Sequence, residues 1–197
     1  MKALHKTLLL SLAVAASAPA FAYDAGDIML RVGVAQVSPD VTTDAVLAGV
    51  DVESNTQLGL TATYMVTPKF GVELLGATPF KHDITAGGVT IGSTKHLPPT
   101  VTAQFYPLDN PTVQPYVGAG LNYTHFWGED LGGAGLTDSV GLALEAGVDI
   151  KVADNVYVNA AVWKIDINTD LETPAGVKVG EVQIDPLAAM IAVGFKF

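Results

Sequence analysis

Residues 140–152 alternate between bulky apolar side chains and small or polar ones. The apolar positions are Val140, Leu142, Leu144, Ala146, Val148, Ile150 and Val152, and between them lie Gly141, Ala143, Glu145, Gly147, Asp149 and Lys151. A helix would need apolar residues at i, i+3, i+4 and i+7, whereas here residues three apart differ in character. The segment therefore predicts a β-strand with one face against lipid and the other against a lumen.

The composition indicates a membrane protein. Charged residues make up 15% of the chain, against roughly 25% in an average soluble domain. Beyond the N-terminus the sequence has no run of about 18 uncharged apolar residues, the length that a spanning helix needs. A closed β-barrel is the remaining structure that pairs every backbone polar group inside a bilayer.

Charge and cysteine content exclude several functions. The formal net charge is −10 and the sequence has no basic patch, so we expect no binding to nucleic acid. The chain has no cysteine, which excludes disulfides, a thiol nucleophile and a lipidated N-terminal cysteine.

The N-terminus has the features of a signal peptide. Lys2 and Lys6 precede an apolar stretch at residues 8–16, and Ala20 and Ala22 are the small residues of a cleavage site. Cleavage after Ala22 would divide the chain into a signal peptide, 1–22, and a mature barrel, 23–197. An anchoring helix is the alternative, but the apolar stretch is short for one.

The remainder divides into eight period-two segments. They cover roughly residues 26–37, 55–66, 70–80, 98–106, 113–127, 140–152, 155–167 and 181–197. Short connections alternate with longer ones at 38–54, 81–97, 128–138 and 168–180. This pattern predicts an all-β fold: a single-domain, eight-stranded antiparallel transmembrane β-barrel with short periplasmic turns and longer extracellular loops, in the outer membrane of a Gram-negative bacterium.

The last strand ends in an aromatic residue. Its outward positions alternate up to the final residue, Phe197. This arrangement resembles the signal read by the barrel assembly machinery, which we expect to be a partner. Four further aromatics, Tyr64, Phe70, Phe105 and Phe195, are expected to complete a periplasmic aromatic girdle with it.

Strand parity predicts a lumen with two different halves. In the periplasmic half, charged residues are expected to pair and close the base: Arg31, Glu73, Glu145, Asp149, Lys151 and Lys196. In the extracellular half the inward residues are mostly apolar, and those expected to line a ligand site are Trp163, Phe126, Leu75, Ile165, Ile184 and Met190. The assignment of Trp163 follows from Asn159, which shares its strand face and would be costly in lipid. A core that packs only on itself is the alternative.

Two consecutive prolines begin the fourth strand. Pro98 and Pro99 cannot donate backbone hydrogen bonds, so they are expected to interrupt the ladder to strand three or five. The gap is a candidate lateral exit for a ligand.

Several motifs resemble the outer-membrane protein W (OmpW) family. They are Gln57-Leu58-Gly59-Leu60-Thr61, Thr63-Tyr64-Met65, Gly71-Val72-Glu73-Leu74, Ala77-Thr78-Pro79-Phe80, His96-Leu97-Pro98-Pro99-Thr100, Pro115-Tyr116-Val117-Gly118-Ala119-Gly120 and Asn122-Tyr123-Thr124. The resemblance covers essentially the whole mature chain. It implies an eight-stranded barrel related to the alkane-utilisation porin and associated with uptake of small hydrophobic molecules, which in some members leave sideways through the barrel wall.

Three functions are therefore compared. The first is a non-enzymatic channel for small hydrophobic molecules that also contacts outer-membrane lipid and lipopolysaccharide. The second is a structural or stress-protective barrel without transport. The third is a lipid hydrolase at the rim, where His82, His96 and His125 lie near Asp83 and Glu129. We expect no catalytic residue, no metal site and no cofactor, because histidines at a rim are more often solvated or hydrogen-bonded.

Overall fold

The computed structural model describes residues 22–197, so the predicted signal peptide lies outside the described residues except for Ala22. Strands dominate this part of the chain. Their bounds are β1 Ile28–Ser38, β2 Thr42–Thr43, β3 Val50–Val52, β4 Asn55–Thr67, β5 Phe70–Ala77, β6 Phe80–Ala86, β7 Val89–Leu97, β8 Thr100–Phe105, β9 Val113–Asp130, β10 Gly135–Leu136, β11 Ser139–Ala153, β12 Val156–Ile165, β13 Asn168–Glu172, β14 Lys178–Gln183 and β15 Leu187–Lys196. A short 3₁₀ helix, η1, spans Ala45–Leu47, and no helix within residues 22–197 has the length and hydropathy to cross a bilayer.

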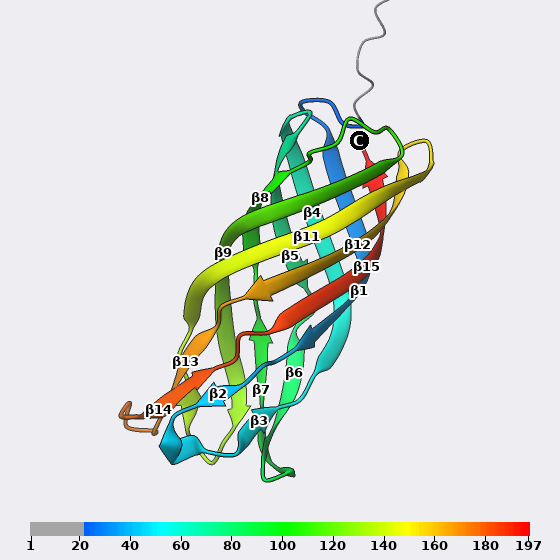
Figure 1. Cartoon of the computed structure of the whole chain (residues 1–197). Coiled ribbons are helices and arrows are strands. Elements are labelled where there is room, and N and C mark those ends of the chain that lie inside the picture. The colour runs from blue at the N-terminus through cyan, green and yellow to red at the C-terminus, as the bar shows by residue number, and fades with distance from the viewer. Residues whose placement is uncertain (1–21) are drawn as a thin grey trace, which may run out of the picture.

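Eight of these strands close into an antiparallel barrel, as the sequence predicted. Their order around the wall is β1-β4-β5-β8-β9-β11-β12-β15, and β15 pairs with β1. Val32 shows the closure, since it faces Val193 of β15 on one side and Leu60 of β4 on the other. The strands run steeply tilted around the wall, and the C-terminus lies at the end with the short turns (Figure 1).

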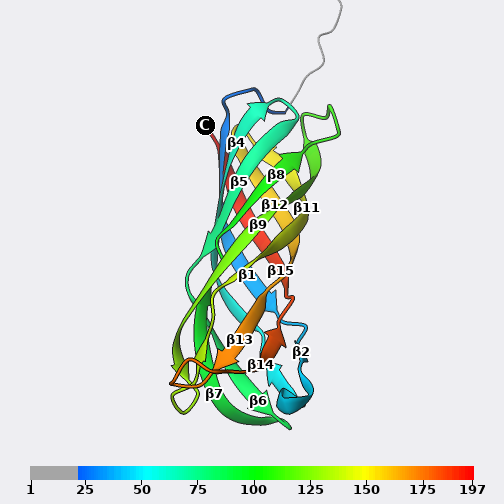
Figure 2. The ribbon, with the colours of Figure 1, turned by 90° about the vertical axis from the view of Figure 1, so that its left-hand side faces the viewer.

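The opposite end of the barrel is built largely from additional strands, which the sequence analysis treated as loops. Strands β6 and β7 form a hairpin, β13 and β14 form a second, and β2, β3 and β10 pair with them. The interpretation of residues 81–97 and 168–180 as loops was therefore wrong. Gly87 and Gly88 both have positive φ, 59° and 79°, which a tight hairpin turn requires. Figures 1 and 2 show this extension continuing the barrel beyond β5, β8, β12 and β15.

Prolines mark the level at which the barrel passes into the extension. The expected strands 70–80, 98–106 and 181–197 are each shorter than predicted and stop beside Pro79, Pro99 and Pro186. A proline has no N–H for the ladder, so a continuous strand cannot pass through these positions in the middle of a sheet.

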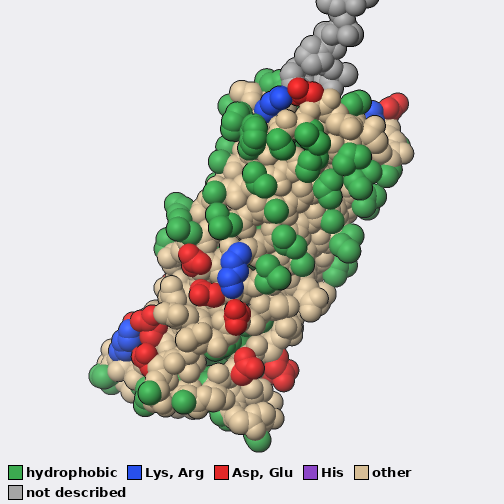
Figure 3. Space-filling model, in the orientation of Figure 1, with side chains coloured by type: hydrophobic (Ala, Val, Ile, Leu, Met, Phe, Trp, Pro, Cys, Tyr) green, Lys and Arg blue, Asp and Glu red, His purple; other side chains and the backbone are tan. Residues whose placement is uncertain are grey.

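The outer face of the barrel is apolar, and its strand parity is as expected. In β12 the even residues from Val158 to Val162 are exposed, while Asn159 and Trp163 are buried. Figure 3 shows hydrophobic side chains spread over the barrel wall, with charged groups at the short-turn end and from about the middle of the molecule to the opposite end. The expected girdle aromatics lie exposed near the short-turn end, where the rings of Phe70 and Phe105 are 5.0 Å apart.

Candidate functional site

A fully buried arginine organises the lumen at the short-turn end. Arg31 Nε and Nη2 donate to the two oxygens of Asp149 at 2.9 and 2.6 Å. Nη1 donates to Glu73 Oε2 at 3.0 Å and to Thr63 Oγ1 at 2.7 Å. Its guanidinium carbon also lies 5.5 Å from the centre of the Tyr116 ring. The planar fork of arginine suits this arrangement, because it binds a carboxylate through two donors and still reaches further acceptors.

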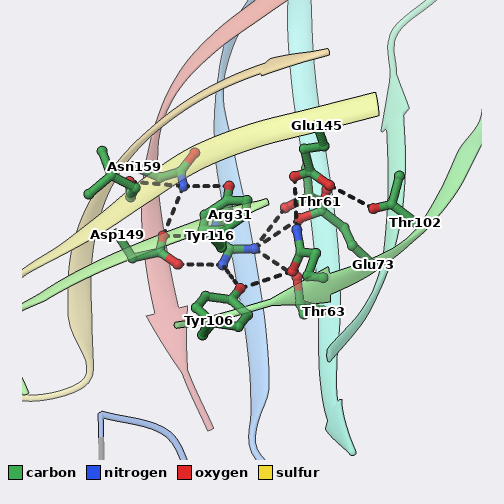
Figure 4. A network of polar contacts seen from close by, with 12 residues as sticks. Arg31, Thr61, Thr63, Glu73, Thr102, Tyr106, Tyr116, Glu145, Asp149 and Asn159 are labelled. Atoms are coloured by element: carbon green, nitrogen blue, oxygen red, sulfur yellow. Dashed lines mark hydrogen bonds and ion pairs between the residues drawn. The ribbon is translucent and has the colours of Figure 1, made fainter. Parts of the chain in front are cut away.

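The surrounding side chains extend this network across the lumen (Figure 4). Glu145 accepts from Thr102 Oγ1 at 2.7 Å and from Gln104 Nε2 at 2.8 Å. Asn159 Nδ2 donates to Asp149 Oδ1 at 2.9 Å. Together the network residues come from β1, β4, β5, β8, β9, β11 and β12, so they link most of the wall across the lumen.

Tyr23 adds a further aromatic side chain to the short-turn side of this network. Its hydroxyl donates to Asp149 Oδ2 at 2.8 Å, and its ring lies 5.1 Å from Tyr106 and 5.9 Å from Tyr157. Sequence reasoning missed this role, because a residue before the first strand carries no parity signal.

Two lysines assigned to the charged plug lie elsewhere. Lys151 Nζ lies 3.2 Å from Asp154 Oδ1 beside the β11–β12 turn. Lys196 Nζ lies 2.9 Å from Asp27 Oδ2 at the short-turn end of the barrel. Both lie near the end of a strand, where the long lysine stem lets the ammonium group reach an acidic partner away from the Arg31 network. The plug is therefore formed by Arg31 with Glu73, Glu145 and Asp149.

On the extracellular side of the plug, apolar side chains line the lumen around a small inner cavity of about 30 Å³. Its lining includes three residues proposed from the sequence, Leu75, Trp163 and Ile165, together with Phe80, Pro98 and Ala188. Trp163 is 1% exposed.

A second, outer cavity of about 100 Å³ lies within the extension. Two further residues proposed from the sequence, Phe126 and Ile184, line it, and most of its remaining wall is aliphatic: Leu47, Val50, Val52, Ile84, Ile91, Leu131, Leu136, Leu171 and Val182. Met190 is buried but borders neither cavity. This cavity was not predicted from the sequence, because the segments that build it were interpreted as extracellular loops.

Two histidines connect the cavities. His82 of β6 and His96 of β7 are 1% and 4% exposed, and their rings stack with centroids 4.8 Å apart and planes 2° apart. His96 borders both cavities, whereas His82 borders the outer one. We place both histidines outside the membrane-spanning strands, because the charged residues Lys81, Asp83 and Lys95 lie on the face of this hairpin opposite the histidines. Burial lowers the pKa of His82, and burial together with His82 lowers the pKa of His96 to about 3, so both rings are neutral at pH 7.

The third histidine of the rim lies apart from this pair. His125 is exposed, and its Nδ1 lies 2.9 Å from Asp138 Oδ1. Among residues 22–197 no group of three or more potential ligand side chains is arranged to hold a metal ion.

The ladder is interrupted beside Pro98 and Pro99 on one side only. Leu75 pairs with Thr100, and the next pair on that side is Phe80 with His96, so residues 76–79 and 97–99 do not pair with each other between these points. On the other side Tyr123 N donates to Pro99 O at 3.0 Å. Pro98 borders the inner cavity, and Pro99 borders a groove on the outer surface with Tyr123 and Trp127. At the gap in the ladder, Pro98 therefore lies on the inner side of the wall and Pro99 on the outer side.

A closed barrel with an apolar outer face and a polar plug defines the class of this protein: it is a small, multi-pass β-barrel of the bacterial outer membrane.

The chain belongs to the OmpW family, whose profile matches residues 24–197. It is 44% identical over 207 aligned residues to outer membrane protein W of Vibrio cholerae serotype O1, covering 94% of this chain and 95% of that protein. The crystal structure of the outer membrane protein OprG from Pseudomonas aeruginosa has a TM-score of 0.79 and 39% identity, covering 89% of this chain and 97% of that one. A more distant relative, the dibenzothiophene metabolism operon protein PahQ of Pseudomonas aeruginosa, is 26% identical over 184 residues, covering 85% and 87% of the two chains.

Proposed function

We propose that this protein is a non-enzymatic outer-membrane channel for small hydrophobic molecules. A molecule would enter the outer cavity, pass His96 into the inner cavity and leave through the wall beside Pro98 and Pro99. The main support for the proposal is that two apolar cavities lie one after the other on the extracellular side of Arg31 and its acidic partners, which fill the short-turn end of the lumen. An apolar solute would have to give up favourable burial to cross that base, whereas the gap in the wall faces lipid.

The energetics of this path favour transport over storage. Each buried methylene contributes about 0.8 kcal/mol, so a ligand of six to eight carbons gains roughly 5 kcal/mol before ordering costs. Binding of that strength is weak and releasable. The inner cavity is smaller than such a ligand, so we expect the side chains around Trp163 to move aside during passage.

The proposed partners follow from the exposed surfaces. Lipid and lipopolysaccharide would cover the outer face of the barrel. Phe197, 71% exposed, would be presented to the barrel assembly machinery during insertion. Its backbone N–H donates to Ile28 O at 2.9 Å and its carbonyl accepts from Ile28 N at 3.1 Å, so the terminal residue lies at the seam where the barrel closes.

A pair of alanine variants tests the path. Ala188 lies inside the wall at the inner cavity, and Ala160 faces lipid on the neighbouring strand. Ala188→Phe should fill the inner cavity, and Ala160→Phe adds the same ring outside. We expect Ala188→Phe to reduce the initial rate of uptake of radiolabelled octane by whole Gram-negative cells to that of cells without the protein. Ala160→Phe should leave that rate unchanged.

Two results would contradict the proposal. Wild-type uptake equal to that of cells without the protein would favour a structural barrel. Unchanged uptake by Ala188→Phe, with the variant shown to be folded by its heat-dependent shift on a gel, would exclude this route through the lumen.

A further inference from the structure

Three buried polar atoms along the apolar path have no hydrogen-bond partner. They are His82 Nε2, His96 Nε2 and Trp163 Nε1. The first two belong to side chains at the outer cavity, and the third belongs to a side chain at the inner cavity, which His96 also borders. Buried polar atoms are nearly always paired in folded proteins, and an unpaired one is costly. Their occurrence on the walls of cavities suggests that a ligand supplies the missing partners.

The hydrogen-bonding role of His82 Nε2 is determined by the other ring nitrogen, Nδ1. His82 Nδ1 lies within hydrogen-bond distance of Glu53 O. A carbonyl can only accept, so Nδ1 must carry the proton. In the neutral ring Nε2 then has a free lone pair and can only accept. His82, a side chain that lines the outer cavity, therefore carries a buried acceptor that needs a donor.

The indole of Trp163 has the opposite requirement. Its Nε1 carries a hydrogen and can only donate, so a side chain that lines the inner cavity carries a buried donor that needs an acceptor. His96 borders both cavities. Neither of its nitrogens makes a hydrogen bond that would fix its tautomer, so it can take either role.

We propose that this path prefers hydrophobic molecules that carry a hydroxyl group, such as aliphatic alcohols and phenols. This inference rests on the proposed function and specifies its substrate class. A hydroxyl group is both donor and acceptor, so it can pair with His82 in the outer cavity and with Trp163 in the inner one. An ether or ketone can accept from Trp163, or from His96 when its Nε2 carries the proton, but it cannot pair with His82, and a hydrocarbon can pair with none of the three. The apolar walls accept the body of the molecule in each case.

A metal ion does not explain the histidine pair. A metal bound to an imidazole nitrogen lies close to the plane of that ring. The two rings are stacked with planes 2° apart, and parallel stacked planes share no point where one ion could bind both. A solute with a hydrogen-bonding group fits this geometry better.

The first test uses the wild-type protein in lipid nanodiscs with ¹⁵N-labelled histidine. The probes are 1-octanol, methyl octyl ether and octane, which have similar apolar bodies and differ in hydrogen-bonding capacity. We expect 1-octanol to move the His82 Nε2 resonance towards the hydrogen-bonded position, while methyl octyl ether and octane leave it in place. A resonance that is already hydrogen-bonded without probe and does not respond to 1-octanol would overturn the proposal, because water would then be the partner.

The second test measures affinity with a variant that keeps an aromatic ring but loses the acceptor. His82→Phe should lower the ratio of 1-octanol to octane affinity by about 3- to 10-fold, which corresponds to the loss of one hydrogen bond. Ala160→Phe, on the lipid face, should leave the ratio at its wild-type value. An unchanged ratio in His82→Phe would overturn the proposal.

The two proposals fail in distinguishable ways. If octane and 1-octanol bind equally and the His82 resonance does not move, the substrate class is wrong and the channel for hydrophobic molecules stands. If neither compound changes Trp163 fluorescence, the proposed function fails, and this inference fails with it.

Discussion

The two halves of the lumen follow the same strand parity but differ in the chemistry of the side chains that point inwards. In the half near the short turns, Arg31 and its neighbours satisfy almost every buried polar atom, with Glu73 Oε1 the exception. In the other half the side chains that line the two cavities are mostly apolar, and three ring nitrogens are unpaired. Alternation alone decides which side chains point inwards. Whether they seal the barrel or leave a path depends on their chemistry.

The largest expected effect concerns the sealed half. Arg31→Met removes the cation and leaves Glu73 and Asp149 buried without it, which should reduce the free energy of unfolding by about 3–5 kcal/mol. Urea titration in detergent, followed by the gel shift of the folded form, measures this loss. Arg31→Lys keeps the charge but not the two-pronged contact, so its loss should be smaller. Equal stability of Arg31→Met and wild type would show that the plug is not held by this ion network.

The next effect concerns the open half and depends on pH. His96 has its pKa lowered from 6.5 to about 3 in the folded protein, so between these values the unfolded hairpin binds a proton that the folded one does not. The folded hairpin should therefore lose stability as the pH falls below 6.5. At pH 4.5 the loss should be roughly 2–3 kcal/mol.

Hydrogen exchange of β6 and β7 amides checks this dependence. Wild type should lose protection between pH 7 and 4.5 relative to His96→Phe, which cannot titrate at this position. Comparing the two proteins at the same pH cancels the intrinsic dependence of exchange on pH. Identical protection of both proteins at pH 4.5 would mean that His96 is not held neutral by burial.

A smaller effect is expected for one hydroxyl of the network. The Tyr106 hydroxyl accepts from Arg31 Nη2 at 3.2 Å and donates to Gln104 Oε1 at 2.9 Å. Tyr106→Phe should reduce the free energy of unfolding by about 1 kcal/mol, because the ring remains and other partners of Arg31 are unaffected. The same urea titration applies. A loss as large as that of Arg31→Met would indicate that the network fails as a single unit.

The smallest effect on stability is expected at the gap in the wall. Replacing Pro98 and Pro99 with threonine supplies two backbone donors, and stability should change by about 0.5 kcal/mol or less. Octane uptake should nevertheless fall severalfold if the gap is the exit. Uptake at the wild-type rate, with the restored pairing shown by hydrogen exchange, would place the exit elsewhere.

The barrel and the inward positions of Arg31, Glu73, Glu145 and Asp149 could be predicted from the sequence because both depend on a local period. Asn159 determined the face of Trp163. The hairpins of the extension were missed because residues 81–97 and 168–180 contain turn residues that mask short strands. Lys151 and Lys196 were misplaced because parity gives the direction of Cβ and not the position of a long, flexible side chain. The free acceptor of His82 depends on Glu53, 29 residues away, and no pattern in the sequence brings them together.

The most direct test of the account measures whether an apolar molecule reaches Trp163 from the upper lumen. The protein has two tryptophans, so Trp127→Phe reports Trp163 alone and Trp163→Phe reports Trp127, at the outer surface. Both variants are placed in nanodiscs and titrated with 1-bromooctane, a heavy-atom quencher. We predict strong, saturable quenching of Trp163, competed by octane, and weaker, non-saturating quenching of Trp127. Quenching of Trp163 that is no stronger than that of Trp127, or that octane does not compete, would contradict a ligand path through this lumen.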